Sequence, residues 1–300
     1  MAFPPWLILA LVSPVFWAVV HVLDSYCVDE LFDRPWVGTV TSSLTMLVAF
    51  PFLACGLLVT GATPLPIDAV ALCILAGFLF MGGQVLYFQA LSYSESGIVA
   101  AYWNLLPLFL LVVSYLVLGE RLTPAKYLGC GLLVVASVSF AVVDGNIEHR
   151  WRSFGLMAAG AWLQVGYFLI LKHLFATCPV YPVFLVVTLA MIAAGLCPLA
   201  APRCRQVFRG NWPRIRRAAW LLIGIEVANL IAVATSQYAI SFGSPSLVAS
   251  VEASIPAYTF LLSLVLYAVT RRYGEEEARH RLPAKLLLVA AMVFGVWLVS

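Results

Sequence analysis

The stretch that decides the fold occurs twice, as Ala90-Leu-Ser-Tyr-Ser-Glu-Ser-Gly-Ile-Val-Ala100 and as Ala239-Ile-Ser-Phe-Gly-Ser-Pro-Ser-Leu-Val-Ala249. The two copies align without gaps as far as Pro107 and Pro256, and the register resumes after an insertion in the second copy. Apolar residues match easily by chance, so the shared serines and prolines give this alignment its weight. The sequence therefore predicts an internal repeat.

The composition places this repeat in a membrane protein. Hydrophobic residues make up 63% of the 300 residues and charged residues 10%, and the mean hydropathy is +0.99. A soluble protein has roughly 45–50% apolar and about 25% charged residues. So few charges cannot cover a water-soluble fold, which excludes the soluble globular, disordered and disulfide-rich secreted classes. The apolar runs last about 18–25 residues, as a membrane-spanning helix requires, and lack the alternating polarity of a membrane β-barrel.

Polar, proline and glycine breaks between the apolar runs predict ten transmembrane helices. The predicted spans are 5–23, 36–59, 67–91, 96–118, 124–143, 153–174, 180–200, 218–240, 245–269 and 283–299. Five helices per half is an odd number, so the second half must be inverted relative to the first. We therefore expect an all-α membrane protein of two inverted five-helix repeats, residues 1–146 and 147–300, without a soluble domain. Inverted repeats are the architecture of secondary transporters, whose substrate site lies near the midplane between the halves.

Three segments resemble the drug/metabolite transporter superfamily of the EamA type. They are the first-helix stretch Trp17-Ala-Val-Val-His-Val-Leu-Asp-Ser-Tyr26, the turn Ala90–Gly97 and the loop Gly119-Glu-Arg-Leu-Thr-Pro124. The resemblance covers essentially the whole chain and implies a ten-helix exporter or permease of small metabolites, without saying which metabolite. The second half departs from the pattern, because Ala268-Val-Thr270 and a charged insertion replace the Gly-Glu-Arg loop.

The basic residues predict how the protein sits in the cell membrane. With ten spans, the odd-numbered connections and the span ends beside them hold 14 of the 17 lysines and arginines, and the even-numbered connections with their span ends and the termini hold three. Basic residues gather on the cytoplasmic side, so this count places both termini outside, whereas the family resemblance implies that both are cytoplasmic. We give the count precedence because it rests on this sequence. The stretch 201–217, with six arginines, Phe208 and Trp212, is either a topology anchor or a lipid-sensing segment; its place at a bilayer surface speaks against nucleic-acid binding.

Pro107 and Pro256 occupy equivalent positions near the middle of the fourth and ninth predicted helices. A proline cannot donate to the carbonyl four residues earlier, so each helix should bend and leave the carbonyl of Trp103 or Glu252 without a partner. Prolines are common in membrane helices, but the same pattern in both halves favours a functional role over a purely structural one.

Two acids lie inside predicted spans. An ionised carboxylate at a helix centre costs about 2.5–3.5 kcal/mol, so it normally faces a cavity or a partner. Glu226 has Asn229 on the same helix face, and the helical rise places Glu226 and Glu252 on opposite sides of the midplane, too far apart to form one pair. Our hypothesis is that Glu252 binds a substrate cation or a coupling proton and that Glu226 assists. The alternative is two neutral acids hydrogen-bonded between helices.

Aromatic and amide side chains are predicted to surround a central cavity. Such a lining suits a small organic solute, above all an amphipathic or cationic one, although each side chain can also serve packing. His21 and Asp24, at the end of the first predicted helix, form either a pH-sensitive gate or an interfacial pair. The predicted lining residues are Trp17, Gln84, Tyr87, Tyr102, Trp103, Asn104, Trp162, Gln164, Tyr167 and Gln237.

The sequence contains no HExxH, GxSxG, Walker or GxGxxG motif, so we expect no enzyme, cofactor or metal site. The seven cysteines form no CxxC pair and are expected to pack. Ala291-x-x-x-Gly295 permits close helix packing, as at a homodimer contact. The predicted function is secondary transport of a small organic metabolite by alternating access in the cell membrane, with proton coupling or facilitated exchange. Two alternatives stay open: a flippase of a lipid-linked headgroup, which a lateral opening would favour, and a non-transporting assembly or sensor subunit, which a cavity too narrow for any solute would favour.

Overall fold

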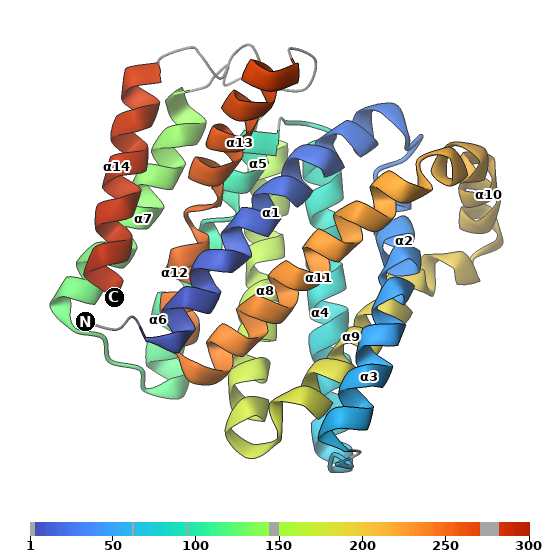
Figure 1. Ribbon diagram of the computed structural model, residues 1–300, viewed down its shortest axis with the longest axis horizontal. Coiled ribbons are helices and arrows are strands. Elements are labelled where there is room, and N and C mark those ends of the chain that lie inside the picture. The colour runs from blue at the N-terminus through green and yellow to red at the C-terminus, as the bar shows by residue number, and fades with distance from the viewer. Residues whose placement is uncertain (1–3, 62, 95, 144–149, 271–281) are drawn as a thin grey trace.

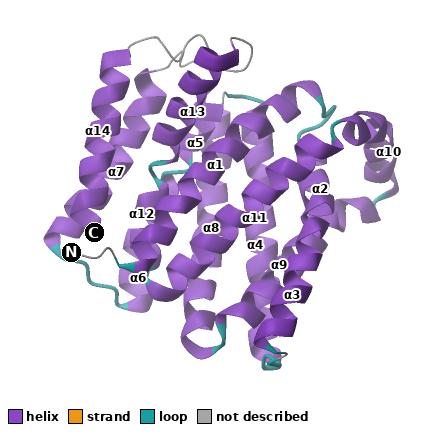
Figure 2. Cartoon of the chain, in the orientation of Figure 1, coloured by secondary structure: helices purple, strands orange, loops and turns teal. Residues whose placement is uncertain are grey.

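The computed structural model describes residues 4–61, 63–94, 96–143, 150–270 and 282–300, and every regular element in these ranges is a helix (Figures 1 and 2). Among them, eight helices are long and apolar enough to cross a membrane, and a shorter apolar helix covers Pro124–Ser139. The chain is therefore an all-α, multi-pass membrane protein. The charged insertion at residues 271–281 lies outside the described residues.

The first half contains two interrupted spans. The helix α2, the short 3-10 helix η1 and the helix α3 follow one another directly and together form the span Trp36–Val59. The helices α5 and α6 are separated only by Trp103 and Asn104 and form the next interrupted span. The elements of this half are α1 (Pro5–Glu30), α2 (Trp36–Thr45), η1 (Met46–Ala49), α3 (Phe50–Thr60), α4 (Ile67–Leu91), α5 (Ser96–Tyr102), α6 (Leu105–Leu118) and α7 (Pro124–Val143).

The second half repeats the interruption within one residue of the equivalent place, because α12 and α13 are separated only by Ala253 and Ser254. Each of the ten predicted spans overlaps one helix or one interrupted helix. The inverted relation of the halves and the boundary at residue 146 stay predictions. The elements of this half are α8 (Arg150–Thr177), α9 (Val180–Leu196), η2 (Cys197–Ala200), α10 (Pro202–Arg217), α11 (Ala219–Phe242), α12 (Pro245–Glu252), α13 (Ile255–Thr270) and α14 (Leu282–Val299).

Two boundaries differ from the prediction for physical reasons. The first helix continues to Glu30 rather than ending at residue 23, because His21 and Asp24 are buried against other helices instead of lying at the membrane surface. The arginine-rich stretch before α11 is itself a helix, α10, which turns Phe208, Asn211 and Ile215 inward. A reading of apolar runs misses such a helix because charged and polar residues interrupt its apolar residues, so that no long apolar run forms.

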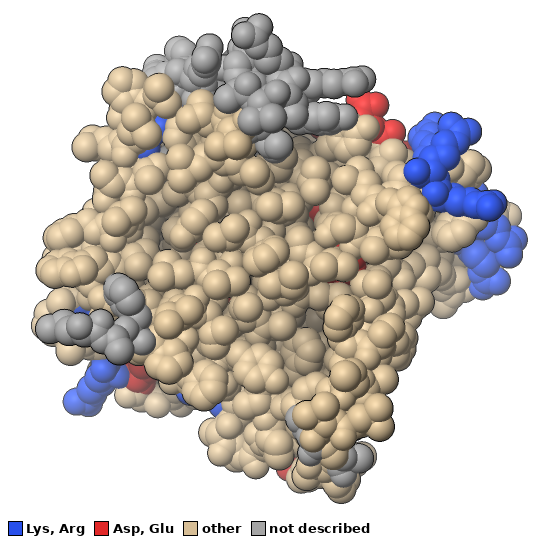
Figure 3. Space-filling model, viewed as in Figure 1, with Lys and Arg blue, Asp and Glu red and all other residues tan. Residues whose placement is uncertain are grey.

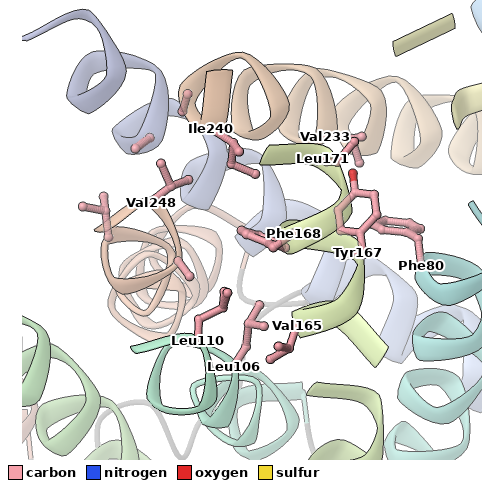
Figure 4. Packing of buried hydrophobic residues seen from close by; sticks show 14 of the residues in the cluster. Phe80, Leu106, Leu110, Val165, Tyr167, Phe168, Leu171, Val233, Ile240 and Val248 are labelled. Carbon is pink, nitrogen blue, oxygen red and sulfur yellow. The ribbon is translucent and has the colours of Figure 1, made fainter. Parts of the chain in front are cut away.

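Helices from the two halves pack together in two apolar clusters, each with residues of both halves. α1 packs along α11, α4 along α8 and α9, and α7 along α14, and α1 and α11 cross the face of the molecule side by side in Figure 1. The packed centre combines side chains of α4, α6, α8, α11 and α12 (Figure 4). Both chain ends lie at the lower left of Figure 1, and α10 lies at the far right.

Candidate functional site

One face of α1 carries four polar or aromatic side chains in a row: Ser13, Trp17, His21 and Asp24. Their spacings of three and four residues place them on the same helix face, over about 16 Å of helix rise. Ser13, His21 and Asp24 are buried despite their polarity. This face of α1 therefore forms a polar line through an apolar bundle.

A small cavity lies at the middle of this line. Its volume is about 20 Å³, which is room for about one water molecule. Four of its lining residues were predicted to surround a cavity. His21 was predicted as part of a gate or an interfacial pair, and Val20 was not predicted. The cavity is lined by Trp17, Val20, His21, Gln84, Tyr87 and Trp103.

Tyr87 links His21 to Asp24. Its Oη lies 2.9 Å from His21 Nδ1 and donates to Asp24 Oδ2 at 3.3 Å, and its ring meets the His21 ring edge-on. All three side chains are buried. The interpretation of His21 and Asp24 as an interfacial pair is therefore wrong, because α1 continues past them and the bundle encloses them.

Glu226 on α11 is held by two donors. Ser42 Oγ on α2 donates to Oε2 at 2.6 Å, and Asn229 Nδ2 donates to Oε1 at 2.7 Å. The contact with Asn229 is the one that the helix spacing predicted. Asp24 lies close enough for its charge to interact with that of Glu226. Ser42 was missed in the sequence, where it stands in the run Thr-Ser-Ser-Leu-Thr of an otherwise apolar span.

Glu252 is the last residue of α12, directly before the break. Its side chain is buried and accepts a hydrogen bond from Ser13 Oγ at 2.9 Å. Ser13 was also missed; the available signal was the pair Ser13-Pro14 inside the first apolar run. Glu226 and Glu252 thus have separate partners on separate helices.

The prolines lie just after the helix breaks rather than at bends within continuous helices. Pro107 is in the first turn of α6 and Pro256 in the first turn of α13, where a missing N–H costs little. The prediction of an unpartnered carbonyl is wrong at Trp103, because the Leu106 amide donates to it at 2.9 Å. Pro107 has no amide N–H to donate to the Trp103 carbonyl. The tight turn at the break brings the amide of Leu106, three residues after Trp103, to this carbonyl instead.

Six of the ten predicted lining residues do not line this cavity. Three of them, Trp162, Tyr102 and Asn104, contact other elements. Trp162 is 54% exposed and stacks on Phe109 at the outer surface. Tyr102 packs edge-on against Phe154. Asn104 is buried beside the first break and donates to the Ala100 carbonyl at 3.3 Å and to Ser137 Oγ on α7.

The remaining three amide and phenol side chains join helices within the core. Gln164 Nε2 donates to the Phe80 carbonyl at 3.3 Å, and Gln237 Nε2 donates to Tyr167 Oη at 2.9 Å. Gln237 Oε1 is buried and has no hydrogen-bond partner within the described part of the chain. A buried acceptor in that state calls for a donor from water or a ligand.

Two charged residues from other elements form hydrogen bonds with the turn between α11 and α12. Glu120, in the loop before α7, accepts hydrogen bonds from Ser244 and, at 2.9 Å, from Ser246. Lys172 Nζ on α8 donates to the carbonyls of Ile240 at 3.2 Å and Gly243 at 2.7 Å. Partial burial raises the pKa of Glu120, while the hydrogen bond from Ser246 and the charge of Lys172 oppose that rise.

The comparisons with known proteins concern the family and the fold of the chain. Residues 4–142 match the model of the EamA-like transporter family. A solved structure titled "Crystal structure of protein" is 16% identical, covers 97% of this chain and 99% of that chain, and superposes with a TM-score of 0.68, which shows a shared fold alone. The search of curated proteins finds no match. Within the described ranges, no group of three His, Cys, Asp or Glu side chains is arranged to hold a metal ion.

Proposed function

We propose, from the premise that residues 4–142 belong to the EamA-like transporter family of the drug/metabolite transporter superfamily, that the protein is a secondary transporter of a small organic solute. The family match bears out the resemblance predicted from the three sequence motifs over residues 4–142, which contain all three motifs. The observation that carries the proposal is the presence of buried carboxylates on helices that cross the core, namely Glu226 and Glu252 in addition to Asp24. Carboxylates inside a membrane bundle are expensive and usually mark the path of a substrate or a proton.

The substrate class that the site fits best is an amphipathic organic cation. The rings of Trp17, Tyr87 and Trp103 face the cavity and can hold a cation through their π-faces. Glu252 and Gln237 do not line the cavity in this conformation. In the proposed cycle, Glu252 supplies a negative charge and the unpartnered oxygen of Gln237 supplies an acceptor for a donor group of the solute. A neutral or anionic solute would use fewer of these groups.

Alternating access would widen the cavity at one end while closing it at the other. Helix breaks are natural hinges, and α1 contacts the elements around both repeat-equivalent breaks, namely α5, α12 and α13. In the proposed cycle, movement of α1 relative to these half-helices exposes Glu252 alternately to the two sides of the membrane.

Glu252 can couple solute movement to protons by competition. A protonated carboxylate is neutral and no longer attracts a cation. The organic cation therefore leaves Glu252 when the proton binds, and the proton leaves when the cation binds. Ser13 holds the carboxylate in place through its hydrogen bond. The expected result is exchange of one organic cation for one proton.

The test uses purified protein in liposomes with an imposed pH gradient and a fluorescent cation, ethidium, among a panel of amphipathic cations. We expect Glu252→Gln to reduce gradient-driven uptake at least tenfold and to abolish its pH dependence, because glutamine cannot release a proton. Asp68→Asn, at the exposed start of α4, is the matched control and should transport normally. An unchanged pH dependence in the Glu252 variant would remove the proposed role.

A second candidate function is a non-transporting assembly or sensor subunit. The observation that favours it is the cavity volume of about 20 Å³, too small for an organic solute in this conformation. Cations that stabilise the purified protein against heat but never cross the liposome membrane would support this candidate over transport.

A further inference from the structure

The helix α10 lies outside the bundle and is amphipathic. Phe208, Asn211 and Ile215 are buried, at spacings of three and four residues, and the arginines of the helix point outward. Two contacts fix α10 to the connection between α1 and α2: Asn211 Oδ1 accepts a hydrogen bond from the Asp33 amide at 3.0 Å, and Arg214 pairs with Asp33 at 2.5 Å. An anchored helix of this composition is typical of the membrane interface.

A groove separates α10 from the first interrupted span. Its volume is about 400 Å³, within the range of ligand sites and far larger than the central cavity. Its walls are mostly apolar and come from α2 and η1 on one side and α11 on the other, with Leu44, Val48, Leu222 and Ile223 among them. A solute with a polar surface would not fit such walls.

The rim of the groove is basic and aromatic. Arg216 and Trp212, both from α10, line it, and both are exposed. Arg214 is paired with Asp33, and Arg205 donates to the carbonyls of Leu199 and Ala200. Within the ranges that the structure describes, no carboxylate forms a salt bridge with Arg216. In Figure 3 the blue atoms of α10 stand out at the right edge of a face that is mostly uncharged.

We propose that this groove binds an anionic phospholipid. One acyl chain lies between α2 and α11, the phosphate sits at Arg216, and Trp212 lies at the level of the glycerol, where tryptophan is favoured in membranes. An apolar slot with a cationic mouth at the bilayer surface matches a molecule with a long hydrocarbon tail and a negative head. The acyl chain of a zwitterionic lipid would also fit the apolar groove, but its headgroup has no net negative charge to pair with the arginines of α10.

The site is adjacent to the polar centre. Thr41 and Thr45 line the groove, and between them on α2 stands Ser42, which donates to Glu226. A lipid in the groove therefore contacts the same helix segment that holds Glu226. The proposal itself concerns binding alone and does not depend on transport.

The experiment measures lipid binding to the purified full chain by native mass spectrometry, with phosphatidylglycerol and phosphatidylcholine as probes. We expect phosphatidylglycerol to bind at least tenfold more tightly. Arg216→Gln should weaken it about fivefold, because the variant loses a direct hydrogen bond to the phosphate that is worth about 1 kcal/mol. Ala219→Phe, which fills the groove, should weaken both lipids.

The control is Arg203→Gln, which removes the same charge from the other end of α10, away from the groove, and should change binding less than twofold. Equal losses in the Arg203 and Arg216 variants would mean that α10 attracts lipids only through its total charge, and would overturn the proposal. Equal affinity for the two lipids would also overturn it. If Ala219→Phe does not fold, the comparison of the two arginine variants decides.

Discussion

At the scale of single residues, Glu120 gives the clearest link between geometry and pH. Partial burial raises its pKa above the ordinary value of 4.5, so the unfolded chain releases this proton at a lower pH than the folded protein does. Stability from this group is therefore full below about pH 4.5 and falls as pH rises through the folded pKa. Glu120→Gln cannot titrate, so its stability does not depend on this group. The melting temperature of the wild type minus that of the variant should therefore decrease as pH rises from 4 and then level off.

Tryptophan fluorescence during heating in detergent measures this difference. Asp68→Asn, which also removes one carboxylate but from an exposed position, serves as the control for a general charge effect. A difference that grows in favour of the wild type as pH rises would contradict the prediction, since it would mean that Lys172 and the two serines stabilise the carboxylate more than burial destabilises it.

The acids of the candidate site could be predicted from the sequence, but their partners could not. Glu226 and Glu252 stand out because a carboxylate in an apolar run is costly unless something compensates for it. Ser13 and Ser42 do not stand out, because a serine in a helix can satisfy itself on a carbonyl of its own helix, as Ser139 does on Val135. Which serine turns to a neighbour depends on how the helices pack.

At the scale of elements, hydropathy predicted where spans lie but not where they break. The break before Pro107 falls at Trp103 and Asn104, four and three residues earlier, because proline is tolerated in a first turn and the chain turns ahead of it. Hydropathy also missed the helix α10, because its inward residues recur only every three or four positions among arginines.

Close contact between α4 and α9 depends on Gly77. A Cβ at this position would lie 2.5 Å from Ala190 Cβ and 2.8 Å from the Ala190 carbonyl carbon, too close for two packed helices. Gly77→Ala should therefore destabilise the protein by about 1–3 kcal/mol, the usual cost of overpacking, despite the better helix propensity of alanine. Thermal unfolding in detergent measures the loss.

Gly131 on α7 is the matched control, because a Cβ there meets nothing within 4 Å. Gly131→Ala should keep or slightly raise the melting temperature through helix propensity. If both glycine variants lost the same stability, the close approach of α4 and α9 would not be the cause.

At the scale of the whole molecule, the two halves are not independent bodies. The long helix pairs α1 with α11, α4 with α8 and α7 with α14 each join one half to the other, so neither half could bury its apolar faces alone. The repeat in the sequence predicts two units of five helices but says nothing about which helices meet. That pairing follows from the complementary surfaces of the folded helices, as at Gly77 and Ala190.

The charge distribution over the whole molecule predicts its orientation. The arginines of α10 lie far from both chain ends (Figures 1 and 3), and basic residues are retained on the cytoplasmic side. A tag at the C-terminus should therefore be cleaved by protease added to intact cells, as should a tag inserted after Thr63 between α3 and α4. A tag inserted after Ala201, directly before α10, should be protected until the cells are lysed. The reverse pattern would show that the arginine-rich end faces outward, and that the cytoplasmic termini implied by the family resemblance prevail over the charge bias of this chain.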